Sequence, residues 1–407
     1  MRSSSIGESE RGEFKVMQLA DKSICTGCGA CAKACPKQAI AYRDDEEGFP
    51  TPYIQTDKCI ECGLCNRVCP ALHMPETHPI QKAYAAQLVD REALKDSTSG
   101  GVFTALAREI FRRGGLVYGC VWDENYNAVV RKAENEEEMI PMRGSKYVWS
   151  WAGDTFPEVK SYLEGGRTVL FTGLPCQVAG LKNYLRKDYD NLYLVNFFCG
   201  GSPSPFAFHE YLKSITKVTP LRELDFKLRD KERDGVGVHI SYNTPKGRVY
   251  QSYVRNPYFF SYHTKVFHRK PCYHCQYRYR DRVDDLTFGD FWGVKKYHPE
   301  LDVRAGISAV LVNTDKGAEL LNAVKDQLIL VETKAENIAP ENNLTLSDKK
   351  VVFHAPEFRD AFFQTLRSKG WTAAERKFLF NKSRLKLYIK RSIPPKYLAL
   401  LKKMLGR

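Results

Sequence analysis

Two cysteine blocks decide the fold of the first part of the chain: Cys25-Thr-Gly-Cys28-Gly-Ala-Cys31-Ala-Lys-Ala-Cys35-Pro36 and Cys59-Ile-Glu-Cys62-Gly-Leu-Cys65-Asn-Arg-Val-Cys69-Pro70. Both blocks read C-x2-C-x2-C-x3-C-P, so eight of the 13 cysteines lie within one short stretch. The polar start, Met1–Val16, lacks the apolar stretch of a secretory signal, which favours a cytoplasmic protein. Because that compartment is reducing, thiols at this density indicate metal ligation rather than disulfides.

This spacing is typical of a run that ligates two 4Fe–4S clusters, in which the fourth thiolate of each block holds the other block's cluster. We therefore expect one cluster on Cys25, Cys28, Cys31 and Cys69, and another on Cys59, Cys62, Cys65 and Cys35. Zinc knuckles are the alternative, but they do not explain a duplicated run of three thiols followed by Cys-Pro. Ile24–Leu72 resembles the two-cluster ferredoxin family, and we place this domain at 17–72.

Composition and charge bound the rest of the chain. Its 407 residues are 43% hydrophobic and 27% charged, as in folded proteins with two or three domains. No apolar run reaches the length of about 18 residues that spans a bilayer. Eleven Lys or Arg and no acidic residue lie in 376–407, so the remaining 375 residues carry only +3 of the net charge of +14.

The residues after a linker at 73–79 alternate between strand and helix patterns, and we expect a mixed α/β domain at 80–345 followed by a basic helical tail at 346–407. The fold class is thus multidomain, α+β or α/β. A strand at 167–171, a helix at 177–185 and a strand at 192–198 form a β-α-β unit, so these strands should be parallel. Cys176 and Cys199 follow them, at the edge where open α/β sheets place their sites.

A further C-x2-C, Cys272 and Cys275, stands among cationic residues that favour the thiolate form. With Cys176 and Cys199 it supplies the four thiols of a third 4Fe–4S cluster. A zinc site that uses this pair with His268 or His274 is the alternative, and the residues alone leave both open. Cys120, inside an apolar strand, is expected to be a buried core thiol.

Nucleotide motifs are informative by their absence, since the chain has neither a G-x-G-x-x-G turn nor a G-x-x-x-x-G-K-[ST] loop. Ser97-Thr98-Ser99-Gly100-Gly101 instead precedes a predicted helix. Free amides and the helix dipole at such a place suit a phosphate or pyrophosphate. Helix capping alone would also place Ser or Thr there.

Five segments together resemble the family of coenzyme F420 hydrogenase/dehydrogenase beta subunits over roughly 80–345. They are Ser99–Leu106, Arg143–Val148, Phe171–Leu181, Cys199-Gly-Gly and Leu286–Gly293. The resemblance implies an FAD-containing iron–sulfur oxidoreductase core and supports the third cluster. One departure is that Cys199-Gly-Gly stands where relatives often show Cys-His-Gly, which puts any role of a histidine there in doubt.

The resemblance also implies flavin contacts. The turn at Ser97, Thr98, Ser99, Gly100 and Gly101 would hold the pyrophosphate, and the isoalloxazine would be lined by Arg143, Gly144, Ser145, Lys146, Tyr147, Thr172, Gly173 and Pro175. Lys146 and Cys176 are the candidate catalytic residues, and Lys146 would stabilise negative charge on reduced flavin. A surface lysine in a turn is the alternative for Lys146. Asp290 would fix backbone or cluster geometry, or cap a loop.

The predicted function is electron transfer from a protein partner through the clusters to FAD and on to a small-molecule or deazaflavin substrate, in either direction. The family's bacterial members suggest a setting in polysaccharide biosynthesis. A non-catalytic electron-relay subunit is the alternative. Nucleic-acid binding by 269–282 is disfavoured, and the tail at 384–407 would be an amphipathic helix on an anionic membrane, a solvated end or a partner's dock.

Overall fold

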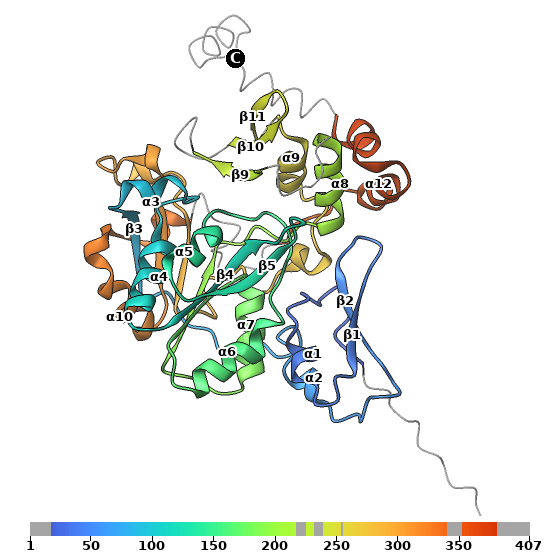
Figure 1. The fold of residues 1–407 in the computed structure, drawn as a ribbon, viewed down its shortest axis with the longest axis horizontal. Coiled ribbons are helices and arrows are strands. Elements are labelled where there is room, and N and C mark those ends of the chain that lie inside the picture. Colours follow the sequence, from blue (N-terminus) through green and yellow to red (C-terminus); the bar gives the residue numbers. More distant parts are fainter. Residues whose placement is uncertain (1–17, 217–224, 232–238, 254, 340–351, 381–407) are drawn as a thin grey trace, which may run out of the picture.

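The computed structural model describes residues 18–216, 225–231, 239–253, 255–339 and 352–380 (Figure 1). The two cysteine blocks form a small module, called here the cysteine module, at the start of the described residues. It consists of α1 (Ala30–Ala34), β1 (Ile40–Asp44), β2 (Pro50–Ile54) and α2 (Leu64–Arg67), with β1 and β2 paired as an antiparallel hairpin. The hairpin was not predicted, because its strands are short and half exposed.

A nine-stranded mixed sheet forms the centre of the second domain, in the order β14-β3-β13-β12-β8-β7-β4-β5-β6. The strands are β3 (Lys82–Leu88), β4 (Leu116–Trp122), β5 (Ala128–Ala133), β6 (Ser150–Trp151), β7 (Val169–Thr172), β8 (Leu192–Phe197), β12 (Leu286–Asp290), β13 (Ser308–Val312) and β14 (Leu328–Thr333). β4, β7, β8 and β12 are parallel neighbours. The predicted β-α-β unit is therefore confirmed, with its two strands adjacent.

The helices of this domain are α3 (Arg91–Lys95), α4 (Val102–Arg112), α5 (Glu136–Met139), α6 (Thr155–Glu164), α7 (Pro175–Leu185), α8 (Pro205–Ile215), α9 (Pro257–His263), α10 (Asp315–Ala323) and α11 (Ala335–Ile338), with short 3-10 turns between them. α4 packs in the core that also contains α10, and α6 and α7 pack in a second core. Among the described helices, none is long and apolar enough to cross a membrane.

A second, three-stranded sheet is antiparallel. Its order is β11-β10-β9, with β9 (Lys227–Asp230), β10 (His239–Thr244) and β11 (Gly247–Ser252). Aromatic side chains from this sheet, α8 and α9 share one core, in which Tyr258 stacks on Tyr211 with ring centroids 5.2 Å apart.

The described part of the predicted tail is helical and packs against the second domain. Helix α12 (Arg359–Ala374) and the π-helical turn η7 (Glu375–Leu379) pack against α8 and α9. Phe362, Leu366 and Trp371 are buried in the aromatic core, because α12 presents an apolar face that a count of charges does not reveal. The stretch 384–407, to which the membrane hypothesis applies, lies outside the described residues.

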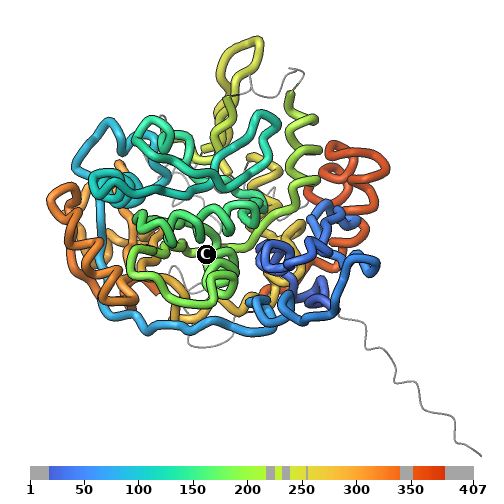
Figure 2. The backbone as a smooth tube through the Cα atoms, turned by 60° about the horizontal axis from the view of Figure 1, so that its bottom comes forward, coloured from blue at the N-terminus to red at the C-terminus, as the bar shows by residue number. Residues whose placement is uncertain are grey.

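The cysteine module contacts the rest of the molecule at several places, among them the linker, Gly29 and the loop after β1. The linker runs along the molecule's edge (Figure 2), where the His78 amide donates to the Arg282 carbonyl at 2.7 Å. A Cβ at Gly29 would lie 2.5 Å from Cα of Gly153, so two backbones touch. The loop after β1 is clamped by α12, whose Arg359 pairs with Glu47 through Nη1–Oε1 at 2.6 Å and Nη2–Oε2 at 2.5 Å.

The Glu47–Arg359 pair generates the first prediction. Both residues are buried, and Arg359→Met leaves Glu47 with the more exposed Lys270 at 3.8 Å in place of its bidentate partner, so it should destabilise the protein by about 3–5 kcal/mol. Anaerobic thermal unfolding checks this against Lys95→Met, which removes an exposed partner of Glu92 and should cost no more than about 1 kcal/mol. Equal shifts in melting temperature for the two variants would contradict the prediction.

Candidate redox site

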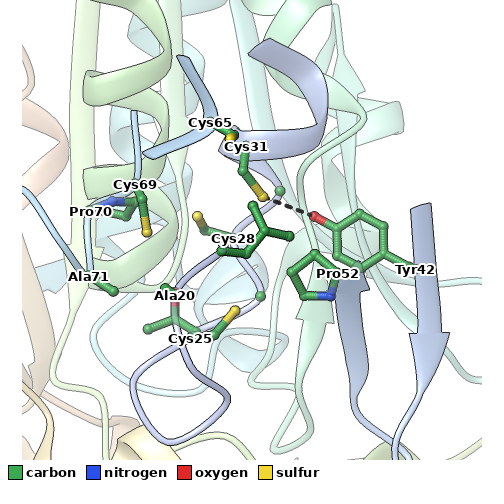
Figure 3. A pocket seen from close by; sticks show the side chains of 14 residues that line it. Ala20, Cys25, Cys28, Cys31, Tyr42, Pro52, Cys65, Cys69, Pro70 and Ala71 are labelled. Carbon is green, nitrogen blue, oxygen red and sulfur yellow. Dashed lines mark hydrogen bonds between the residues drawn. The ribbon is translucent and has the colours of Figure 1, made fainter. Parts of the chain in front are cut away.

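Four thiols of the cysteine module surround one small cavity beneath the β1–β2 hairpin. Cys25, Cys28, Cys31 and Cys69 line it together with Tyr42, and Figure 3 shows their sulfurs facing a common space. Cys65 reaches the same cavity from the neighbouring set. Burial raises the pKa of Cys28 to about 12. Iron binds the thiolate, so a bound cluster would favour the deprotonated form against this effect of burial.

A second cavity is lined by Cys35, Cys59, Cys62 and Cys65. The structure thus brings together the same two groups of four that the spacing predicts, with the fourth thiol of each block beside the other block's three. The blocks also repeat their backbone shape: Gly27 and its counterpart Glu61 have φ of 72° and 51°. Cys62 is exposed, whereas Cys28 is buried, so the two cavities differ in their access to solvent.

A third set of thiols lies at the carboxyl edge of the main sheet. Cys176 begins α7 after β7, Cys199 follows β8, and Cys272 and Cys275 come from the 3-10 turn η3 (Lys270–His274) and the residue after it. The four are close enough for the charges of the other three to act on Cys176, after burial the main cause of its raised pKa. The Ser202 amide donates to Sγ of Cys272 at 3.4 Å.

The residues named for the zinc and nucleic-acid alternatives differ in their burial. His268 is buried at 1% exposure, and neither ring nitrogen has a partner among the described residues. His274 is exposed. Over the described residues, no three His, Cys, Asp or Glu side chains are arranged to hold a single metal ion. Tyr273 and Tyr277 are buried and so cannot stack on bases.

Eleven of the thirteen predicted flavin contacts line one cavity of about 260 Å³ beside the third set. They are Ser97, Thr98, Ser99, Gly101, Arg143, Gly144, Ser145, Lys146, Tyr147, Thr172 and Gly173. The exceptions are Gly100 and Pro175, and the candidate catalytic Cys176 is also outside the lining. A Cβ at Gly100 would lie 2.1 Å from the Ala86 carbonyl oxygen, so this glycine permits packing against β3. Pro175 is buried in the first turn of α7.

The serine–glycine turn forms one end of this cavity. Gly101, with φ of 76°, precedes α4, and no side chain of the described residues caps that helix. The Ser145 amide donates to the Thr98 hydroxyl at 2.7 Å, which joins this turn to the 143–147 segment. Lys231 stiffens the turn from behind by donating to the Ser99 carbonyl at 2.6 Å. The free helix end is suited to an anionic phosphate.

Lys146 lies in the lining with its ammonium held by its own turn. It donates to the carbonyls of Pro141, Arg143 and Gly144 at 2.8, 2.9 and 3.1 Å. Burial lowers its pKa to about 8. The side chain closes its own turn and belongs to the cavity lining.

Several lining residues were missed or misassigned from the sequence. Cys120 is a correction: it is only half-buried and lines the cavity, because β4 ends at the cavity wall. Asp290 lines the cavity and pairs with Arg229 at 2.9 Å, and the same guanidinium reaches the Tyr147 hydroxyl at 3.1 Å. Arg229 gave no signal because it belongs to the separate small sheet.

Cys199 connects the third set with the cavity, since it belongs to both. At the other side, a Cβ at Gly180 of α7 would lie 2.8 Å from Sγ of Cys28. Gly180 follows Cys176 by one helical turn, so both residues lie on the same side of α7. The first set therefore contacts α7 close to Cys176 of the third set. Arg269 bridges the same gap, with Nε donating to the Cys25 carbonyl at 2.9 Å. The thiol sets are thus arranged in series: exposed second set, first set, third set, cavity.

The chemistry of these residues fits three 4Fe–4S clusters. Each set offers four sulfurs, the ligand number of a cubane. Arg278, buried at 2% exposure, has nitrogens without a partner among the described residues and acts electrostatically on Cys199 and Cys275. A buried cation beside four thiols is suited to an anionic cluster.

The contact at Gly180 generates the second prediction. Gly180→Val should displace Cys28 and reduce the iron content, because the added side chain occupies the position of the sulfur. Gly165→Ala is the matched control, since a Cβ there meets its nearest atom at 3.4 Å with φ of −78°. Iron analysis of both anaerobically purified variants checks the prediction, and normal iron in Gly180→Val would refute it.

Three segments of the chain match models of known protein families. Residues 24–72 match the 4Fe-4S dicluster domain. Residues 83–153 and 166–337 match the N-terminal and C-terminal parts of the family described as coenzyme F420 hydrogenase/dehydrogenase, beta subunit.

Relatives with curated names share low identity with this chain over much of its length. A subunit of the F(420)H(2) dehydrogenase of Methanosarcina mazei is 21% identical over 78% of this chain and 87% of its own length. Coenzyme F420-dependent sulfite reductase of Methanocaldococcus jannaschii is 23% identical over 77% of this chain, which spans 48% of that enzyme. A structure of the F420-reducing NiFe hydrogenase complex from Methanosarcina barkeri aligns at 18% identity and a TM-score of 0.46, over 66% of this chain and 88% of that one. The chain belongs to the family of coenzyme F420 hydrogenase/dehydrogenase beta subunits and carries a 4Fe–4S dicluster domain before the family's region.

Proposed function

We propose that this chain is an iron–sulfur flavoprotein that carries electrons between a protein partner and a substrate bound over FAD. The observation that carries the proposal is the position of Cys199, which belongs to the third thiol set and also lines the cavity of the predicted flavin contacts. A flavin in this cavity would exchange electron pairs with a substrate and single electrons with clusters.

The residues that would hold FAD are those of the cavity lining. The Ser99–Gly101 turn and the uncapped end of α4 would bind the pyrophosphate, because their amides and the helix dipole favour negative charge. The segment from Arg143 to Tyr147 and the residues Thr172 and Gly173 would flank the isoalloxazine. Lys146 would supply a positive charge, while its N–H groups stay bonded to the backbone.

Electrons would enter or leave at the second thiol set, because its Cys62 is exposed, whereas every thiol of the first and third sets is buried or half-buried. The partner would be a protein that presents its own redox centre at this surface. The names of the curated relatives make a deazaflavin coenzyme the first substrate to test. A setting in polysaccharide biosynthesis, and contact between 384–407 and a membrane, stay predictions.

A relay subunit without a substrate site of its own is the second candidate. It is favoured by the relative from Methanosarcina mazei, which is named as one subunit of a dehydrogenase. The two candidates differ in what the purified chain does alone. Turnover of the deazaflavin coenzyme with reduced viologen supports an enzyme, and cluster reduction by the viologen without substrate reduction supports a relay.

The composition of the holoprotein is the third prediction. Anaerobic purification should yield about twelve irons per chain, as three cubanes require, and one FAD. Cys275→Ser should reduce iron to about eight and should slow flavin reduction by reduced viologen, while the ferredoxin-type EPR signals persist. Cys120→Ser is the matched control, because this thiol lines the cavity outside the third set, and its iron content should stay normal. Zinc in place of the third cluster would defeat the proposal.

The charge of Lys146 gives the fourth prediction. Lys146→Met should lower the flavin midpoint potential by about 30 mV, a tenfold change for a two-electron couple, because a cation that stabilises reduced flavin is lost. The difference from the wild type should be present below about pH 8 and vanish above it, since the ammonium deprotonates as pH rises through its pKa of about 8.

Lys231→Met is the matched control for Lys146. Lys231 is also held by three backbone carbonyls and burial also lowers its pKa to about 8, but it lies outside the cavity lining. Its removal should weaken FAD binding through the Ser99 turn and leave the flavin potential unchanged. An equal fall in potential in both variants would assign Lys146 to turn stability alone.

A further inference from the structure

Arg278 is a buried cation beside the third thiol set. Its side chain is 2% exposed, and Nη2 lies 3.5 Å from the carbonyl oxygen of Gly200, the residue after Cys199. The ring of Phe353 covers the guanidinium, with Cζ 3.6 Å from the ring centroid. Its charge acts on Cys199 and on Cys275. The guanidinium is therefore held between an aromatic ring and the thiols, away from bulk water.

Two nitrogens of this guanidinium are left without an acceptor. Nε and Nη1 are buried and lack a hydrogen-bond partner in the part of the chain that the structure describes. A buried donor left unpaired costs about 1–3 kcal/mol, and more when the group is charged. Such a position is tolerated when an anion from outside the chain accepts the two N–H groups.

Arg280 and Arg282 differ from Arg278 in that each donates to an acceptor on a side chain. Arg280, two residues later, is part-exposed and donates to Glu336 at 2.5 Å. Arg282 donates through Nε to the Thr287 hydroxyl at 3.2 Å. Lys265 adds a second cation beside the third set, and its ammonium donates to the same Gly200 carbonyl at 2.8 Å. Within the described ranges no carboxylate pairs with Arg278.

We propose that Arg278 is a positioning residue that donates Nε–H and Nη1–H toward the sulfurs of the cluster on Cys176, Cys199, Cys272 and Cys275, and so raises its reduction potential. The proposal rests on the third cluster of the proposed function. Reduction adds one negative charge to an already anionic set, and a cation in a low-dielectric site favours the more negative state. One electron leaves the reduced first set and is gained by the third, and no proton is transferred.

The consequence is a direction for the buried step. With Arg278 in place, an electron at the first set would find an acceptor of raised potential at the third set, whose Cys176 lies one turn from Gly180 on α7 and beside the cavity. Hydrogen bonds to cluster sulfurs and nearby charge are both known means by which proteins set cluster potentials. Arg278 supplies both from one side chain, as a planar guanidinium with fixed donors can.

The test is an EPR-monitored redox titration of the anaerobic full-length protein. The third cluster's signal is identified as the one lost in Cys275→Ser. Arg278→Gln should make its reduction at least tenfold less favourable, a fall of about 59 mV for one electron, and should leave the two ferredoxin-type signals unmoved. Arg280→Gln, two residues away and part-exposed, should leave all three midpoints unchanged.

Arg278→Lys separates the role in the potential from a role in folding, since it keeps the charge and loses only the planar fork. Its third-cluster midpoint potential should fall by less than about 59 mV, the shift that corresponds to a tenfold change for one electron. If Arg278→Gln loses iron, the result with Arg278→Lys decides the question. The inference would be overturned by an unchanged midpoint potential in Arg278→Gln or by an equal fall for all three clusters. A fall of about 59 mV or more in Arg278→Lys would also overturn it. Absence of a third signal in the wild type would instead refute the proposed function.

Discussion

The approach of Cys28 to helix α7 is the constraint on which the rest of the molecule depends. Sγ of Cys28 occupies the position that a side chain at Gly180 would need, and Cys176 lies one turn earlier on the same helix. Electron transfer between two clusters requires that only a thin layer of protein separates them. This contact keeps the cysteine module and the sheet's carboxyl edge at such a separation, provided that the module cannot move away.

The contacts around the module serve to hold that separation. Arg269 donates to the Cys25 carbonyl from one side, and the buried Glu47–Arg359 pair closes the other. The backbones of Gly29 and Gly153 touch without side chains between them. A ferredoxin-type module on a flexible linker would deliver electrons by diffusion, whereas this one is fixed at its docking site. In the proposed function, exchange with a partner takes place at the second set, where Cys62 is exposed.

The sequence carried much of this arrangement, for physical reasons that differ from part to part. The eight-cysteine spacing predicted both groups of four thiols in the cysteine module, because a cubane restricts the length of the loop between its ligands. Strand and helix periods placed Cys176 and Cys199 at one edge, since adjacent parallel strands end together. The flavin contacts came from the family resemblance, and eleven of them line one cavity, while Gly100 and Pro175 are packing residues. The role of Arg278 depends on burial, which no local pattern reports. The docking of α12 depends on an aromatic core assembled from elements that are distant in the sequence.

The central claim is that three clusters lie in series and end at the cavity lined by Cys199. Iron-edge anomalous diffraction from crystals of the anaerobically purified protein measures this directly. The account predicts iron density at the two cavities of the cysteine module and at the Cys176–Cys275 set, with flavin density in the cavity beside it. Density at the zinc edge in any of these sets, or a third set without iron, would contradict the account.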